Sequence, residues 1–136
     1  MLIVRHRFDV EAAVKHTCEL IAEAGANDAK LIAFPELWIP GYPTYVFAHD
    51  KKAASRYTLQ YYRNSVEVDS THMFRIRAAA RAAKIMVVLG YSERERGSLY
   101  MSQTFIDANG AVLLHRRKFK PTGYERTIFG DGVCST

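Results

Sequence analysis

The stretch LIAFPELWIPGYP, residues 31–43, decides how the rest of the chain can fold. Its first four residues, 31–34, form a continuous apolar run, which is typical of a strand covered on both faces. Pro35 cannot donate a hydrogen bond to a neighbouring strand, so the strand is predicted to end there. Glu36 follows at once. It is therefore expected at the carboxyl edge of the sheet, where α/β folds place their ligands.

The segment before this strand is predicted to be a helix. Asp9 is a suitable N-cap, because its carboxylate can accept hydrogen bonds from unpaired backbone N–H groups. Gly25 is the expected C-terminal stop. Apolar side chains between them recur at helical spacing, namely Val10, Ala13, Val14, Cys18 and Ile21. Cys18 is accordingly expected to pack against the sheet as a small hydrophobic residue.

The segments after residue 43 continue the alternation of helices and strands. Residues 44–68 are interpreted as an aromatic loop leading into a helix, and Asp69 or Ser70 is expected to cap a further helix. Three more strands are predicted, at residues 85–89, 100–106 and 111–115. The last two are joined by a hairpin turn at 107–110. This order predicts an α/β fold with a mixed sheet.

The composition fits one globular domain. The chain has 136 residues, of which 49% are hydrophobic and 24% charged. No apolar run approaches the roughly 20 residues of a membrane-spanning helix, and residues 1–7 are too short for a signal peptide. We therefore expect a cytoplasmic protein. Cys18 and Cys134 lack the spacing of metal ligands, so free thiols are expected, with neither a metal nor a cofactor.

The net charge of +5 is concentrated in residues 116–126. Only Glu125 opposes the basic residues there, which are Arg116, Arg117, Lys118, Lys120 and Arg126. Such a cluster is compatible with nucleic-acid binding, with a solvated loop or with a site that handles anions. The charge pattern alone leaves all three interpretations open.

Two side chains in these segments could carry chemistry. Glu36 is flanked by Pro35, Leu37 and Trp38, and poor solvation would raise its pKa and suit it to act as a general base. Lys118 stands at the end of a predicted strand, where it could stabilise a developing negative charge. Glu125 follows seven residues later and could orient the ammonium. Taken separately, these features are better explained by a surface glutamate in a turn and by a basic strand followed by a loop.

Together, the segments resemble one family. Residues 34–36 and 39–43 (FPE and IPGYP) resemble the first active-site motif of nitrilases. Residues 116–122 (RRKFKPT) resemble the lysine segment of the same family, and the match extends from about Phe8 to Gly132. Further matching residues are Glu125-Arg126, Phe129–Gly132, Gly90–Glu93, Ser98–Tyr100 and Gln103. The resemblance implies that residues 1–136 are a partial carbon–nitrogen hydrolase domain, the N-terminal half of an αββα sandwich.

The resemblance also implies an activity. In nitrilases a cysteine thiolate attacks the carbon of a nitrile, and water hydrolyses the covalent intermediate. Glu36 would be the general base, Lys118 would stabilise the tetrahedral intermediate, and Glu125 would be an accessory carboxylate. The nucleophilic cysteine is expected beyond residue 136, because nothing around Cys134 resembles the strand-to-helix turn that a nucleophile occupies. The 136 residues alone are therefore expected to be inactive.

The expected partners follow from the same resemblance. They are a small nitrile or cyanide as substrate and, in the family, further copies of the protein in a homo-oligomer. An alternative function is a non-catalytic interaction module that assembles with full-length homologues. Nucleic-acid binding through Arg75, Arg77, Arg81 and residues 116–120 is the weakest alternative, because the sequence contains no RNA-binding motif. Membrane association is not expected.

Overall fold

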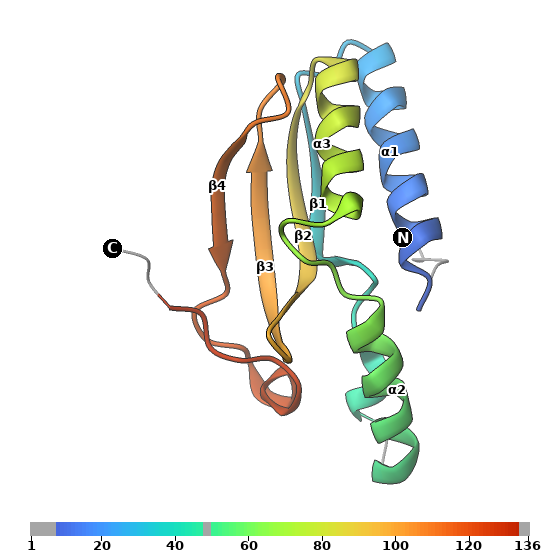
Figure 1. The fold of residues 1–136 in the computed structure, drawn as a ribbon, viewed down its shortest axis with the longest axis vertical. Coiled ribbons are helices and arrows are strands. Elements are labelled where there is room, and N and C mark those ends of the chain that lie inside the picture. Colours follow the sequence, from blue (N-terminus) through green and yellow to red (C-terminus); the bar gives the residue numbers. More distant parts are fainter. Residues whose placement is uncertain (1–7, 48–49, 134–136) are drawn as a thin grey trace.

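The computed structural model describes residues 8–47 and 50–133, which form a four-stranded sheet with helices on one face (Figure 1). The strands lie in the order of the sequence: β1 (Leu31–Ile39), β2 (Met86–Glu95), β3 (Ser98–Ile106) and β4 (Val112–Arg117). The α-helices are α1 (Val10–Ala26), α2 (Lys51–Arg63) and α3 (Thr71–Ala83). Two 3₁₀-helices follow strand ends, η1 (Thr44–Phe47) and η2 (Gly123–Thr127). None of the described helices is both long and apolar enough to cross a membrane.

The sheet is mixed, as predicted. β1 pairs with β2 in parallel, whereas β2–β3 and β3–β4 are antiparallel. β1, β2 and β4 therefore end at the same edge of the sheet. The hairpin before β4 depends on Asp107, whose carboxylate accepts hydrogen bonds from the backbone N–H groups of Asn109 and Ala111, both at 2.8 Å. Gly110 supplies the positive φ of +79° that the turn needs.

Helices α1 and α3 lie side by side on one face of the sheet (Figure 1). Asp9 caps α1 as predicted, because its carboxylate accepts from the N–H of Ala12 at 2.9 Å. Gly25 does not end the helix, which continues to Ala26. A Cβ on Gly25 would lie 2.8 Å from that of Ala83, so its role is to let the two helices approach closely. The core beneath them includes Val14, Ile21, Met73, Ile76, Val87, Leu89 and Ile106.

The apolar strand at the start of β1 is covered less completely than predicted. Leu31 is 50% exposed, and Leu114 at the opposite edge of the sheet is 49% exposed. Leu31 pairs with Met86, and Leu114 with Phe105, on the face away from α1 and α3. The described residues therefore leave an apolar face of the sheet in contact with water, as expected for half of a two-sheet sandwich.

Two local features differ from the prediction. β1 does not end at Pro35 but continues to Ile39, with an irregular register after Phe34. Pro35 is tolerated because the ladder to β2 is interrupted at this point. Cys18 packs against the hydrophobic core as predicted, but it is only partly buried, and its thiol lies 3.8 Å from the carbonyl oxygen of Arg75 on α3.

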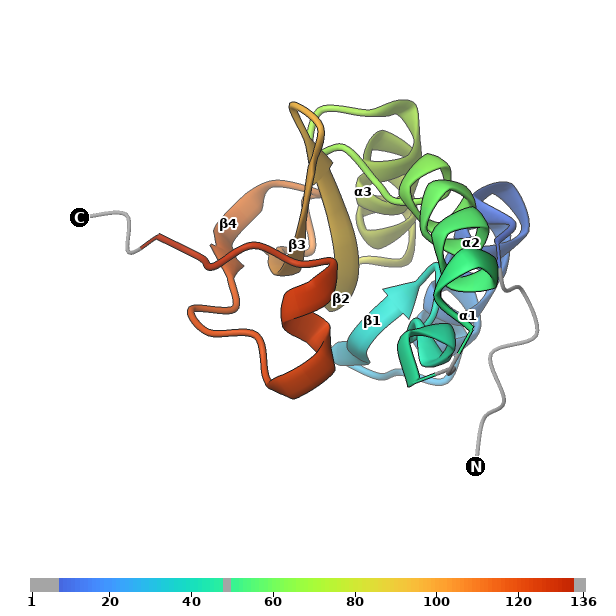
Figure 2. The same cartoon turned by 90° about the horizontal axis from the view of Figure 1, so that it is seen from below.

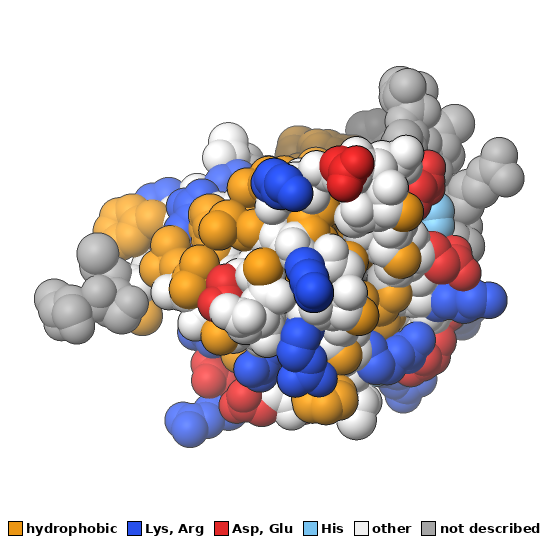
Figure 3. Space-filling model, turned by 90° about the horizontal axis from the view of Figure 1, so that it is seen from above, with side chains coloured by type: hydrophobic (Ala, Val, Ile, Leu, Met, Phe, Trp, Pro, Cys, Tyr) orange, Lys and Arg blue, Asp and Glu red, His pale blue; other side chains and the backbone are white. Residues whose placement is uncertain are grey.

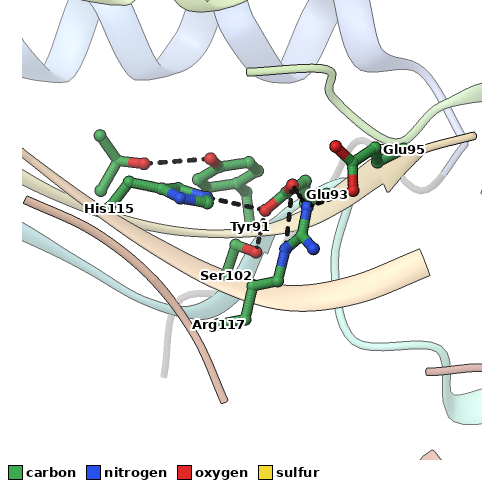
Figure 4. A network of polar contacts seen from close by, with 7 residues as sticks. Tyr91, Glu93, Glu95, Ser102, His115 and Arg117 are labelled. Carbon is green, nitrogen blue, oxygen red and sulfur yellow. Dashed lines mark hydrogen bonds and ion pairs between the residues drawn. The ribbon is translucent and has the colours of Figure 1, made fainter. Parts of the chain in front are cut away.

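A cluster of polar side chains is buried on the helix-facing side of β2, β3 and β4 (Figure 4). Its centre is Glu93, whose side chain is only 1% exposed. One carboxylate oxygen accepts from Ser102 and contacts His115 Nε2 at 2.8 Å, and the other accepts two hydrogen bonds from Arg117. Register explains the gathering, because Arg117 pairs with Ser102, and Glu93 with Tyr100, across adjacent strands.

Burial alone would raise the pKa of Glu93, but the hydrogen bonds from His115, Arg117 and Ser102 lower it to about 2. Because this is below the ordinary value of 4.5, ionised Glu93 stabilises the fold above pH 4.5. That stabilisation is lost as the pH falls from 4.5 towards 2. The difference between the two pKa values corresponds to about 3 kcal/mol of folding free energy, because solvent screens the contacts of so buried a carboxylate only weakly.

We therefore expect Glu93→Gln to destabilise the protein most at neutral pH. Urea unfolding should show a loss of about 3 kcal/mol near pH 6, and the gap to the unmodified protein should narrow as the pH falls to 3. Glu95→Gln is the matched control, since Glu95 contacts the same arginine from a half-exposed position. A gap that stays constant with pH would contradict the assignment of the low pKa to Glu93.

Candidate active site

The three residues singled out in the sequence lie together at the edge where β1, β2 and β4 end. Lys118 directly follows β4, and its ammonium lies between two carboxylates. Lys118 Nζ is 3.2 Å from Glu36 Oε1 and donates a 3.0 Å hydrogen bond to Glu125 Oε2. Figure 2 looks onto this edge of the sheet and shows η2, which carries Glu125, between the ends of β4 and β1.

Glu36 and Lys118 come from the two outer strands of the sheet, not from neighbouring strands as predicted. The path of β1 explains how they meet. Phe34 pairs with Leu89 and Ile39 with Tyr91, so residues 35–38 bulge out over a single residue of β2, Gly90. A Cβ on Gly90 would clash with the Pro35 carbonyl and lie 2.9 Å from Glu36 Cα. Because Gly90 has no side chain, the backbone of residues 35–38 can lie over β2, which brings Glu36 towards Lys118.

The bulge is held on its other side by the core. Trp38 points under α1, where its indole N–H donates to Thr17 Oγ1 at 2.9 Å. The hydroxyl of Thr17 in turn donates to the carbonyl oxygen of Ala13 at 2.7 Å. Leu37 is buried and takes a φ of +53°, which is unusual for a residue with a side chain. These contacts turn Leu37 and Trp38 away from solvent and leave Glu36 at the surface.

Glu125 is the most constrained member of the site and is 6% exposed. Its Oε2 accepts the backbone N–H of Thr122 at 2.6 Å, which closes a capping box at the start of η2. Its Oε1 accepts a 3.0 Å hydrogen bond from the hydroxyl of Tyr42. Tyr42 belongs to the motif at residues 39–43, but no local pattern predicts this hydrogen bond, which joins residues 83 positions apart.

The charges in the site stabilise one another. Burial would raise the pKa of Glu125, but the hydrogen bonds from Thr122, Lys118 and Tyr42 outweigh it, so this pKa lies below its ordinary value. Burial would likewise lower the pKa of Lys118, yet its contacts with Glu125 and Glu36 raise it overall. Lys118 is thus held as an ammonium beside two carboxylates, an arrangement that can stabilise developing negative charge.

The solvation of Glu36 differs from the prediction. Its side chain is 51% exposed, although the apolar residues beside it suggested burial. Leu37 and Trp38 are buried on the other sides of the bulge and do not cover the carboxylate. Desolvation by the neighbours in the sequence therefore does not prepare Glu36 for base catalysis in the part of the chain that the structure describes.

Within residues 8–47 and 50–133 no thiol accompanies this site. Cys18 lies between α1 and α3, where burial raises the pKa of its thiol and so makes it a poor nucleophile. Cys134, whose sequence context does not resemble that of a nucleophile, lies outside the described residues. The same described ranges contain no cluster of three His, Cys, Asp or Glu side chains suited to a metal ion.

The basic residues of segment 116–126 are largely neutralised by acidic residues from elsewhere in the chain. Arg117 pairs with Glu93 and Glu95, while Lys120 and Arg126 share Asp131. Figure 3, which views the opposite end of the molecule, shows Lys and Arg side chains spread among acidic and hydrophobic ones. The pairing of the segment's charges does not favour the nucleic-acid interpretation, which needs a continuous basic surface.

An α/β sheet with a lysine between two glutamates at its carboxyl edge fits a hydrolase that handles charge on a small substrate. The sequence profile of the carbon-nitrogen hydrolase family matches residues 4–135, so the chain belongs to that family. The sheet also resembles an amidase from Nesterenkonia sp. with a TM-score of 0.70 at 24% identity, over 98% of this chain and 46% of that one. At this identity the likeness concerns the fold alone.

Curated relatives are more similar in sequence. An arylacetonitrilase of Aspergillus niger is 51% identical over 128 residues, which are 93% of this chain and 38% of that protein. A cyanide hydratase of Gibberella zeae is 46% identical over 95% of the chain and 36% of its own length. An aliphatic nitrilase of Rhodococcus rhodochrous is 45% identical over 92% and 34%. The chain thus spans little more than a third of the length of these relatives.

The site geometry predicts the effect of removing the ammonium. In Lys118→Met the pKa of Glu125 should rise towards its ordinary value, because one of the three groups that stabilise its charge is lost. Carbon-13 NMR of the carboxyl groups would measure this. Lys120→Met removes the same charge two residues away, where the lysine pairs with Asp131, and should leave Glu125 unchanged. Equal titration of Glu125 in both variants would contradict the pairing.

A second prediction concerns Gly90. Gly90→Ala places a methyl group against the backbone of Pro35 and Glu36, so it should cost about 1–3 kcal/mol of stability and displace Glu36. Urea unfolding and the loss of the Lys118–Glu36 contact by NMR would measure both effects. Gly97→Ala is the comparison: its Cβ would meet no atom within 4 Å, and only the positive φ of +85° is strained. Gly97→Ala should therefore leave the position of Glu36 unchanged.

Proposed function

We propose that this chain provides the general base, the lysine and the accessory carboxylate of a nitrilase-type hydrolase acting on carbon–nitrogen bonds. The observation that carries the proposal is the position of Lys118, 3.2 Å from Glu36 and 3.0 Å from Glu125. The names of the relatives point to nitriles or cyanide as substrate class. The nucleophile would be a cysteine thiolate outside the described residues.

The proposed reaction assigns one task to each group. Glu36 takes the proton of the thiol, the thiolate adds to the nitrile carbon, and Glu36 passes the proton on to the nitrogen, which gives a thioimidate and restores the carboxylate. Glu36 then takes a proton from water as it attacks the same carbon. Lys118 stabilises the negative charge that develops at each addition. Glu125, held by Thr122 and Tyr42, keeps the ammonium in place.

The outcome depends on which bond of the tetrahedral intermediate breaks. Loss of ammonia leaves a thioester, which a second water converts to the carboxylic acid. Loss of the thiol instead releases the amide, as in the hydration of a nitrile or of cyanide. The three residues of this chain serve both routes in the same way, so the position of Lys118 does not select between acid and amide.

A chimera tests the proposal. In it, this chain replaces the matched 128-residue part of the Aspergillus niger arylacetonitrilase, and ammonia release from phenylacetonitrile is measured. Activity is expected. Lys118→Ala should lower kcat by about 10²–10³-fold and Glu36→Gln by about 10²–10⁴-fold. Lys120→Ala is the matched control and should stay within a few-fold of the chimera. A folded chimera in which Lys118→Ala and Lys120→Ala behave alike would refute the role of Lys118.

The 136-residue polypeptide alone should show no nitrilase activity. General acid–base help contributes only about 10²–10⁴-fold, which is too little for unactivated nitriles without a positioned thiolate. Release of ammonia and of amide from phenylacetonitrile and from cyanide should therefore equal that of a Lys118→Ala control. Turnover clearly above this control would disprove the expectation, and its loss in Cys134→Ala would then identify Cys134 as the nucleophile.

The second candidate function is a non-catalytic module that assembles with longer homologues. Exposed apolar side chains favour it, because Leu31 on β1 and Leu113 and Leu114 on β4 are about half exposed. Co-expression of the chain with the Aspergillus niger arylacetonitrilase distinguishes the two functions: stable co-purification without a gain in activity supports the module. Homo-oligomer formation in the complete protein is a separate proposal, which rests on the family resemblance.

A further inference from the structure

The buried Glu93 cluster and the candidate active site meet at consecutive residues. Arg117, the last residue of β4, contacts Glu93 on the helix-facing side of the sheet. Lys118 is the next residue, and its side chain contacts Glu36 and Glu125 instead. Neighbouring residues of an extended chain point to opposite faces. A force that fixes the Arg117 side chain therefore also fixes the direction in which Lys118 leaves the strand.

Arg117 is held on three sides. Its guanidinium donates twice to Glu93 Oε1 and once to Glu95 Oε2, the last at 2.8 Å. The guanidinium carbon also lies 3.8 Å from the ring centroid of Tyr100, which is a close cation–π contact. A planar guanidinium that is bound in this way has little freedom to rotate.

The end of β4 needs such a restraint. β4 has six residues and is an edge strand of the described sheet, next to β3. After Arg117, the Lys118 N–H donates to the Met101 carbonyl oxygen of β3 at 2.7 Å, and the Lys118 carbonyl oxygen accepts from the Gly132 N–H at 3.0 Å. Backbone hydrogen bonds at the end of a short edge strand fray readily, and they do not by themselves fix the direction of the Lys118 side chain. A displacement of about 1 Å at a reacting group can cost roughly a hundredfold in rate.

We propose that Glu93 is a positioning residue for Lys118: through Arg117 it clamps the end of β4 so that the ammonium reaches Glu36 and Glu125. The positioning role rests on the proposed function, whereas the clamp itself concerns only where the Lys118 side chain lies. The rest of the Glu93 cluster supports the clamp. Ser102 and His115 bind the second carboxylate oxygen and keep Glu93 oriented towards Arg117.

The titration of Lys118 in the 136-residue chain tests this without any activity. Arg117→Gln removes a positive charge next to Lys118, which by direct electrostatics should raise the pKa of the lysine. The clamp predicts the opposite sign: Lys118 leaves its two carboxylates, and its pKa falls towards that of a free lysine. Glu93→Gln should also lower it. NMR of the lysine side chains, with Lys118→Met for assignment, measures the shift.

Arg116→Gln is the matched control. It removes the same charge one residue earlier in β4. In the described part of the chain, the Arg116 guanidinium donates to the side-chain oxygen of Gln103. The pKa of Lys118 should stay constant or rise in this variant. A rise in both arginine variants would overturn the proposal. The double variant Glu93→Gln/Arg117→Gln should lower the pKa no further than either single change, because both act through one clamp.

If Arg117→Gln does not fold, Arg117→Lys decides the question. It keeps the charge but loses the two-pronged hydrogen bonding to Glu93. A lowered pKa of Lys118 supports the clamp, and an unchanged one overturns it. In the active chimera, Arg117→Lys and Glu93→Gln should lower kcat about 10–100-fold with KM nearly unchanged. If the chimera itself is inactive, the proposed function fails, while the titration of Lys118 still decides the clamp.

Discussion

The crossing of residues 35–38 over Gly90 is the constraint on which the site depends. Strands β1 and β4 are separated by two further strands, and neighbouring strands lie about 4.8 Å apart, so their side chains would not meet in a regular sheet. The bulge solves this by placing four residues of β1, 35–38, opposite one residue of β2. It is possible only because Gly90 has no side chain at the point of crossing.

The two carboxylates around Lys118 differ in a way that matches their proposed tasks. Glu125 is buried and bound by a backbone N–H, a tyrosine hydroxyl and the ammonium, so it stays ionised and has little freedom to move protons. Among the residues that the structure describes, the ammonium of Lys118 is the ionic partner of Glu36, whose side chain is half exposed. A carboxylate with free lone pairs is the one that can take a proton from a thiol or from water. Their environments thus suit Glu125 to hold the ammonium in place and Glu36 to transfer protons.

Much of this could be predicted from the sequence. Helical spacing located α1 and α3, the Asp107–Gly110 turn located the β3–β4 hairpin, and the motifs around Glu36 and Lys118 identified the three site residues. What was missed depends on contacts between distant residues. The continuation of β1 past Pro35 and the exposure of Glu36 follow from the bulge over Gly90, and no local propensity indicates it. The Glu93 cluster depends on register across three strands, which side-chain alternation alone does not fix.

The exposed apolar face of the sheet and the exposed carboxylate of Glu36 would both be covered by the same additional layer of structure. Interactions between charges are several-fold stronger in a desolvated site than in water, and Glu36 is 51% and Lys118 30% exposed. Leu31 and Leu114, on the outer strands that also carry Glu36 and lead into Lys118, face solvent as well. A layer packed on that face would bury the leucines, and where it reached the strand ends it would exclude water from the ion pair. Packing free energy and the electrostatic strength of the site would then come from one interface, so a fold of two sheets supplies what a single sheet cannot.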